Sequence, residues 1–484
     1  MSETKIIYRD IAPGAEDAAS VTTSGAQPFS QIAQLPHGLD CVPTCTCELN
    51  HWGLDGVYTL RGNRSVAFWS AEISDADGAF DSPPVITITL SENFSSTGIS
   101  LVFGDGNWAA SVKIDWYLQS TLRASKTFSP NRAEYFCSNK VTSYDKVVLT
   151  FLASHLPYQY IKLEHVVFGV VRTFGMEELR GSNVVKEMNL IAEELPVSNL
   201  NWTLQSRDNV DYLFQFKQPV EVRNGGETLG IFYIDDSTRL GESTYDIKCI
   251  DAIGVLDESP FPGGDYLSGV SATALLTAIV DGAFQVDITV PDVTLYGLLL
   301  PSTRREAVQQ VIFAWRACAA TTSTGTIQVF RPAETEPVDL GKDRTVPGVS
   351  ARREPAVTAV KVTAHTYTVD SSGSIELDGV KYADAKQVFT VTNPEVTSAD
   401  RERVIRVSDA TLVAPVIGAA VAQHVFDYYN RRDTLRGEVV WDSDALGELV
   451  LMPNDWSDGL EGHIVKMEIK LSNTVIANSE VRLV

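Results

Sequence analysis

The densest group of metal-binding residue types in this 484-residue chain lies in the stretch HGLDCVPTCTCELNH. It begins at His37 and contains Cys41, Cys45, Cys47 and His51. Thiolates and imidazoles hold zinc tetrahedrally, so these residues are zinc candidates. However, no C-x-x-C pair is present, and Cys45 and Cys47 alternate as strand neighbours do, which favours free thiols over zinc. Six cysteines are too few for a disulfide scaffold, and we expect no cofactor.

Sequence signatures of catalysis are missing elsewhere. The chain has no H-E-x-x-H, no G-x-S-x-G, no Walker A motif and no G-x-G-x-x-G that opens a helix. His424 lies in the apolar helical stretch AQHVFDYY, and His365 and His463 lie in strand-like stretches. For each of them, a hydrogen-bonded core histidine is a better interpretation than a catalytic base.

Carboxylates are abundant, so pairs of them carry little information. Asp235-Asp236 and the pair Asp442 and Asp444 lie beside expected turns, where solvated side chains are the rule. The stretch SDADGAFD offers oxygen ligands for calcium but lacks the closing glutamate of an EF-hand. We therefore expect a protein that is not an enzyme.

Aromatic side chains near the first β-rich stretches could bind carbohydrate, because sugar rings stack on exposed aromatic faces. Trp69 and Trp116 lie within strand patterns and are expected in a core. Trp108 lies in the turn-like stretch GDGNW and is expected to be exposed. Trp108 is therefore the candidate for sugar binding.

Short alternating β patterns dominate the chain. The stretch DYLFQFKQPVEVRNGGETLGIFYIDD places Asn224-Gly225-Gly226 between two apolar-rich runs, which predicts a β-hairpin. A similar strand pattern recurs around Gly462 near the end of the chain, so the chain could contain a duplicated β-barrel. We expect a mainly β fold with an α+β insertion. The expected parts are an extended N-terminal segment (1–50), a β-sandwich (51–169), a first β-barrel (170–259), a small α+β domain (260–347) and a second β-barrel with a helix (348–484).

Helix signals concentrate between residues 271 and 430. Ser271 can cap the run ATALLTAIV, and Thr303 with Glu306 forms a capping box before a helical apolar pattern. A further helix is expected to start near Pro415.

The net charge is −23 and is unevenly distributed. Residues 1–166 hold 11 Lys and Arg and 17 Asp and Glu, which leaves 28 and 45 for residues 167–484. Acidity of this size opposes adhesion to nucleic acid or to an anionic membrane. No run approaches the roughly 20 apolar residues that cross a bilayer, and the start MSETKIIYRDIAPGAED lacks the apolar core of a signal peptide. We expect synthesis in a cytoplasm and no membrane insertion.

Several long stretches resemble the baseplate-hub or tail-tip proteins of bacteriophages and phage-like particles of Gram-positive bacteria. They are FQFKQPVEVRNGGETLGIFYIDDSTRLGESTYDIKCIDAIGVLDESPFPGGDY, RREAVQQVIFAWRACAATTSTGTIQVFRP and, in the front half, FWSAEISDADGAFDSPPVITITLSE and YIKLEHVVFG. The front half resembles a discoidin-like sandwich of the carbohydrate-binding-module type.

The resemblance implies a homotrimer at the tip (baseplate) of a virion tail, synthesised in the cytoplasm of a bacterial host. Each subunit would carry two tail-tube-like β-barrels, so three subunits would present six similar units to the six-fold tube. The implied partners are the tail tube protein, the distal tail protein and a spike or fibre protein, with DNA passing through the channel without specific binding. The alternative is an adhesin that binds host cell-wall glycan through the N-terminal sandwich. Because the chain ends after the second expected barrel, we expect any cell-wall cleavage to come from another protein.

Overall fold

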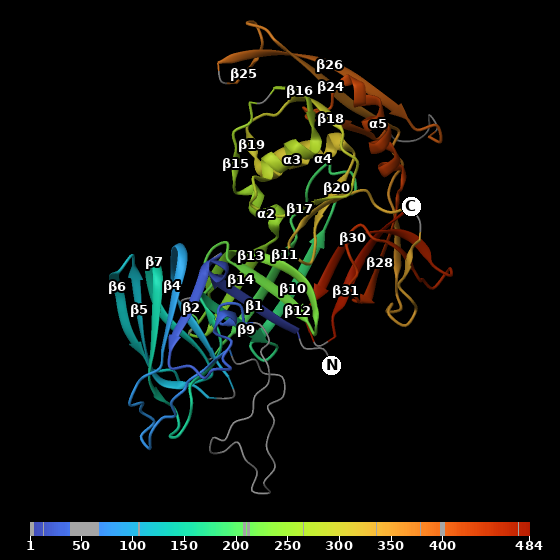
Figure 1. Ribbon diagram of the computed structural model, residues 1–484. Coiled ribbons are helices and arrows are strands. Elements are labelled where there is room, and N and C mark those ends of the chain that lie inside the picture. The colour runs from blue at the N-terminus through green and yellow to red at the C-terminus, as the bar shows by residue number, and fades with distance from the viewer. Residues whose placement is uncertain are drawn as a thin grey trace. The chain divides into compact units, whose positions relative to one another are not determined.

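The structure is a computed structural model. It describes residues 4–12, 14–38, 67–104, 107–206, 210, 213–264, 266–334, 336–377, 379–396, 402–472 and 474–484. The chain divides into two compact units, one formed by Met1–Ile7 with Thr173–Val484 and the other by Tyr8–Arg172. Most of its regular structure is β-strand, as predicted (Figure 1). The finer five-part division made above stays a prediction. No helix of the described residues is long and apolar enough to cross a membrane.

The unit Tyr8–Arg172 is built on two long antiparallel strands. These are β4 (Val85–Phe103) and β7 (Glu134–Ser154), which pair along most of their length. β4 is continuous over 19 residues, and its register with β7 shifts between Thr89 and Gly98. The sheet order is β3-β8-β4-β7-β5-β6, with β2 on β4. The remaining strands are β2 (Ala19–Ser24), β3 (Phe68–Trp69), β5 (Ala109–Leu118), β6 (Thr121–Phe128) and β8 (Lys162–Val167).

Different ends of β4 have different neighbours. β2 pairs with its start and β8 with its last four residues, and between these segments the register with β7 is irregular. Such irregularities bend strands, and the bent strands enclose one apolar core that includes Trp116, Leu149 and Phe151. The front segment was expected to be extended, but within it β2 joins this sheet, and the short helices α1 (Ala15–Ala18) and η1 (Ile32–Gln34) accompany it.

The larger unit contains the same strand plan twice. The first half-sheet has the order β10-β11-β14-β13-β12, and the second has the order β23-β28-β31-β30-β29. Numbered along the chain, both orders read 1-2-5-4-3, and every pairing within them is antiparallel. The strands of the first are β10 (Leu179–Glu187), β11 (Asn199–Gln205), β12 (Pro219–Asn224), β13 (Glu227–Arg239) and β14 (Thr244–Ile250). Those of the second are β23 (Ser350–Arg353), β28 (Asp433–Val440), β29 (Leu449–Met452), β30 (Leu460–Lys470) and β31 (Ile476–Leu483).

The two half-sheets form one continuous sheet, because β10 pairs with β30 from Asn183↔Lys470 to Glu187↔Lys466. The two half-sheets thus supply ten strands of a 13-stranded sheet within the described residues. Beyond β12 this sheet continues through β1 (Thr4–Ile11) and β9 (Gly169–Gly175). The boundaries between the two units in the sequence lie within these two strands. β22 (Val338–Asp339) pairs in parallel with β29.

The predicted hairpin around Asn224 is confirmed. β12 and β13 pair from Pro219↔Tyr233 to Asn224↔Glu227, which leaves Gly225 and Gly226 as the turn. Gly225 has φ = 59°, in the left-handed region that glycine adopts without steric cost.

Helices and short strands lie between the half-sheets in sequence. α3 (Ala272–Val280) is capped by Ser271, and α4 (Arg304–Trp315) begins with the predicted Thr303–Glu306 capping box. α2 (Ala252–Asp257) was not predicted, and Asp251 caps it. The accompanying strands are β15 (Pro260–Phe261), β16 (Tyr266–Ser271), β17 (Val286–Ile288), β18 (Thr294–Leu298), β19 (Ser302–Thr303), β20 (Cys318–Thr321) and β21 (Ile327–Phe330).

Within the second half-sheet, the connection from β23 to β28 is long. It forms β24 (Ala359–Val369), β25 (Ile375–Leu377), β26 (Val380–Thr392), β27 (Val404–Val407) and α5 (Pro415–Asn430). α5 starts at Pro415, as predicted. This insertion shares one core with α3 and α4, since Val360, Leu276, Val311 and Val421 belong to the same buried cluster. The insertion therefore packs with the preceding α+β region.

Candidate functional site

Trp108 is half-buried, whereas an exposed ring was expected. The His155 imidazole stacks on it with 3.8 Å between ring centroids and an interplanar angle of 20°. Asn107 Oδ1 lies 2.8 Å from His155 Nδ1 and helps to hold the imidazole in place. One face of the indole is therefore occupied, and sugar binding by Trp108 stays a prediction. Trp69 and Trp116 are buried, as predicted.

The zinc candidates Cys41, Cys45, Cys47 and His51 lie outside the described residues. The three cysteines inside them are buried, and burial raises the pKa of the Cys249 and Cys318 thiols to about 12. A thiol with so high a pKa is a poor nucleophile at neutral pH. The structure places no three His, Cys, Asp or Glu side chains of the described residues where they could hold a metal ion.

Two of the polar residues singled out in the sequence are buried and paired. His365 is 4% exposed and contacts the Asp384 carboxylate at 3.0 Å and the Ser408 carbonyl at 3.1 Å, which confirms a hydrogen-bonded core histidine. Asp444 was expected to be solvated, but it is 7% exposed and accepts hydrogen bonds from Arg344 at 2.6 and 2.8 Å. Burial of a carboxylate requires such a partner.

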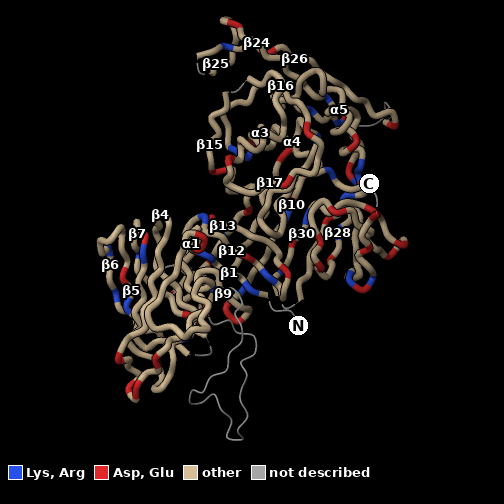
Figure 2. The backbone as a smooth tube through the Cα atoms, viewed as in Figure 1, with Lys and Arg blue, Asp and Glu red and all other residues tan. Residues whose placement is uncertain are grey.

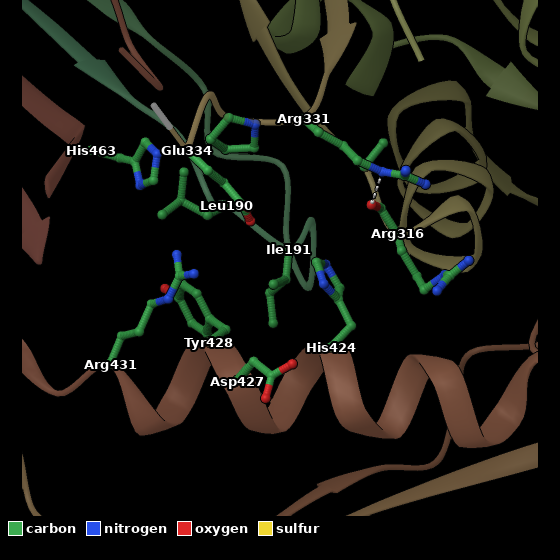
Figure 3. Close-up of a pocket in the computed structure, with 12 residues that line it drawn as sticks. Leu190, Ile191, Arg316, Arg331, Glu334, His424, Asp427, Tyr428, Arg431 and His463 are labelled. Atoms are coloured by element: carbon green, nitrogen blue, oxygen red, sulfur yellow. Dashed lines mark hydrogen bonds between the residues drawn. The ribbon is translucent and has the colours of Figure 1, made fainter. Parts of the chain in front are cut away.

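A cavity of about 300 Å³ lies beside the C-terminal half of α5 (Figure 3). His424 and Tyr428 project into it from one face of α5, and Arg431 projects into it from the position directly after the helix. His463 on β30 and Glu334 after β21 line it from other segments. The cavity thus brings together residues that are far apart in the sequence.

Basic groups predominate among the lining residues. Arg316, Arg331 and Arg431 contribute three guanidinium groups, against the carboxylates of Glu334 and Asp427. Arg331 donates hydrogen bonds to the carbonyls of Trp315 and Arg316 at the C-terminus of α4, where such carbonyls lack partners within the helix.

Two histidine nitrogens at this cavity are buried without a hydrogen-bond partner. They are Nε2 of His424 and Nδ1 of His463. His463 is 1% exposed, and its Nε2 lies 2.7 Å from the Ala333 carbonyl. In the neutral imidazole, Nε2 therefore donates and Nδ1 is left as an acceptor. His424 was expected to be a hydrogen-bonded core histidine. This is wrong for its Nε2 atom, which has no hydrogen-bond partner at the cavity.

Electrostatics at His424 are dominated by burial and by positive charge. Burial, followed by repulsion from Arg316, Arg331 and Arg431, lowers the pKa of His424 to about 4, and Asp427 acts in the opposite direction. Burial also lowers the pKa of His463. Both imidazoles are accordingly neutral at pH 7. Of these lining residues the sequence analysis singled out only the two histidines. The run DYYNRR at the end of α5 was an available signal for the basic end of the cavity.

No protein-family profile and no curated protein matches the chain. Among solved structures, it is similar to the 43 kDa tail protein of prophage MuSo2 from Shewanella oneidensis, at 14% identity and a TM-score of 0.42 over 64% of this chain and 95% of the other. It is also similar to a tail protein from Neisseria meningitidis MC58, at 12% identity and a TM-score of 0.47 over 64% and 93%. A third structure, prophage tail protein gp18 from Listeria monocytogenes EGD-e, gives 13% identity and a TM-score of 0.42 over 64% and 91%. Each TM-score is below 0.5.

Proposed function

We propose that this chain is a structural protein of a bacteriophage or phage-like tail, namely the trimeric baseplate hub of a particle that infects or targets Gram-positive bacteria. The observation that carries the proposal is the occurrence of one five-strand order, 1-2-5-4-3, twice in a single chain. The quoted sequence resemblance to tail-tip proteins is independent support for it.

Two similar half-sheets in each subunit would let a three-fold assembly match a six-fold one. Closed homo-oligomers present as many equivalent surfaces as they have subunits. A trimer whose subunits each hold two similar half-sheets presents six similar units to a six-fold tail tube. The same trimer keeps three-fold symmetry for a spike or fibre. The distal tail protein would bind around this collar.

The charge distribution supports a role as a passage for DNA. Residues 167–484 hold 45 acidic and 28 basic side chains. Acidic residues recur on the loops of the second half-sheet, where Asp442, Asp455 and Asp458 are exposed (Figure 2). A wall of this sign repels phosphates and lets DNA slide without adhering.

Unpaired strand edges in the larger unit are available to neighbouring subunits. β26 pairs with β24 along one side and with β25 only at residues 380–382 on the other. Within the described part of the chain, residues 383–392 have no strand on that second side, and Val388 is 57% exposed there. Unpaired edges of this kind bind further strands.

Size-exclusion chromatography with light scattering tests the proposal on the full chain at micromolar concentration. The subunit mass is 52.9 kDa, so a trimer has a mass of about three times that value. Negative-stain images should then show a ring of six similar units. A persistent monomer at this concentration, or a closed dimer, overturns the proposal.

A further inference from the structure

We propose that the cavity beside α5 is a binding site for a small oxyanion of the phosphate class, carried by free phosphate or by a phosphate monoester. This inference concerns a ligand of the individual subunit and does not rest on the tail assembly proposed above. Three features of the cavity carry it: its charge, its unpartnered polar atoms and its size.

The charge of the lining is unusual for this molecule. In a chain of net charge −23, three arginines and two carboxylates meet at the cavity, which gives a local net charge of +1 with both histidines neutral. The Asp427 carboxylate is partly engaged, because its Oδ1 accepts a hydrogen bond of 2.7 Å from Gln423 Nε2 on the same helix. Arg431, the residue after α5, extends into the cavity, and no ion pair joins it to another described side chain (Figure 3). A guanidinium in this position is a ready donor to an oxyanion.

The unpartnered histidine nitrogens point to a ligand that both donates and accepts hydrogen bonds. A buried polar atom without a partner costs stability, and a ligand that supplies the partner recovers that loss. His463 Nδ1 is an acceptor in the neutral ring and can receive the P–OH hydrogen of a hydrogen phosphate. His424 Nε2 can donate to an anionic oxygen once the ring is protonated. A singly protonated phosphate offers both kinds of group.

Size restricts the occupant further. A cavity of about 300 Å³ is at the lower end of the range for small-molecule sites. It accommodates a phosphate and part of its ester group, whereas a peptide segment or a nucleic-acid strand needs an open groove. The small molecule is therefore the occupant to which the geometry points.

Isothermal titration calorimetry on the full chain, at constant ionic strength, can test the site with three probes. Inorganic phosphate and AMP are expected to bind, and adenosine is not. Tighter binding of AMP than of phosphate identifies a monoester as the ligand source, and the reverse identifies the free anion. If neither phosphate nor AMP binds at millimolar concentration, or if adenosine binds as well as AMP, the proposal is wrong.

A pair of opposite charge changes distinguishes an oxyanion site from a merely structural cluster. Arg431→Gln is expected to weaken binding about ten-fold or more, because a charge-assisted hydrogen bond is lost. Glu334→Gln, which removes an exposed carboxylate from the lining, is expected to tighten binding by about two- to five-fold. Arg406→Gln, an exposed arginine on β27, is the matched control and should change nothing. Equal effects of R431Q and E334Q would contradict the proposal.

Proton uptake gives an additional readout. A bound anion counteracts the repulsion from Arg316, Arg331 and Arg431 and raises the pKa of His424 toward its ordinary value. Binding near pH 5.5 should therefore take up a proton, seen as a dependence of the heat on the ionisation enthalpy of the buffer. His424→Asn should remove the His424 share of this dependence while the fold persists. If H424N and the native chain take up the same number of protons, His424 does not face the ligand.

Discussion

The two half-sheets of the larger unit share a strand order but differ in what fills them. In the first, aromatic rings pack together, with centroid distances of 5.4 Å for Phe174–Trp202, 5.5 Å for Trp202–Phe214 and 5.7 Å for Phe214–Tyr245. In the second, several polar side chains are buried. They are Thr434, Asp444, Asn454, His463, Ser479 and Arg482. The first half-sheet also buries polar side chains, among them Lys186 and Glu221, so the packed aromatic group is what distinguishes it. Of the buried polar side chains of the second, His463 lines the cavity.

The half-sheets also differ in the connection between their first and second strands. Residues 188–198 make this connection in the first, and residues 354–432 make it in the second. The longer connection contributes α5 and the residue after it, and hence four of the eight polar residues that line the cavity. Similar sheets can therefore acquire different roles through one loop, as expected when function is carried by connections on a rigid scaffold.

The largest effect is expected from Trp202→Ala in the first half-sheet. Trp202 is 1% exposed at the centre of the aromatic group. Truncating a buried tryptophan to alanine leaves a cavity and costs about 3–5 kcal/mol of unfolding free energy. Hydrogen–deuterium exchange should show faster exchange in β11 and β14, with β28 and β31 unaffected. Equal acceleration in both halves would show that they do not differ in local stability.

Next in size is Arg344→Met beside the second half-sheet. It leaves the buried Asp444 carboxylate without its guanidinium partner, which costs about 3 kcal/mol. The counterpart in the first half-sheet is Arg223→Met, where the arginine side chain is 44% exposed and the pair with Glu221 contributes less than about 1 kcal/mol. Urea denaturation of the two variants measures the difference, and similar midpoints for both would contradict it.

A third test concerns Lys186 on β10, the strand that joins the halves. Burial lowers the pKa of Lys186 from 10.5 to about 8, and Asp251 opposes that shift. Between pH 8 and 10.5 the unfolded chain binds more protons, so stability rises with pH through this window and is lowest below it. Lys186→Met should raise the unfolding free energy at pH 7 by as much as about 3 kcal/mol and remove the Lys186 share of this rise. Melting temperatures of both proteins at pH 7 and pH 10 check this, and parallel changes would contradict it.

The smallest effect is expected at the turn between β12 and β13. Gly225→Ala forces a side chain into the left-handed region at φ = 59° and costs about 1 kcal/mol. At Gly226, an added Cβ meets nothing within 4 Å, so Gly226→Ala should cost less. Thermal denaturation of the two variants compares adjacent positions, and an equal loss would show that the conformation of Gly225 is not the cause.

Features that depend on neighbouring residues were predictable from the sequence. The Asn224 hairpin, the Thr303–Glu306 capping box and the start of α5 at Pro415 are all confirmed, because turn and cap chemistry is local. The pairing of β10 with β30 was not predictable, since no local pattern encodes which distant strand will be adjacent.

The candidate site was predictable only in fragments. His424 and His463 were singled out, but their nitrogens lack partners only because α5, β30 and the ends of α4 and β21 meet in space. Asp444 was expected in solvent because turn carboxylates are usually solvated, and Arg344, about a hundred positions earlier in the chain, overrides that rule.

The pairing of β10 with β30 has a consequence for any shortened form of the chain. β10 is the first strand of one copy of the plan and also the neighbour of the fourth strand of the other copy. Deletion of either copy from the gene would leave the survivor with an open row of main-chain donors and acceptors. Either half-sheet alone would thus expose a strand edge that is paired in the intact chain, and an exposed edge is a site at which other chains can add a strand.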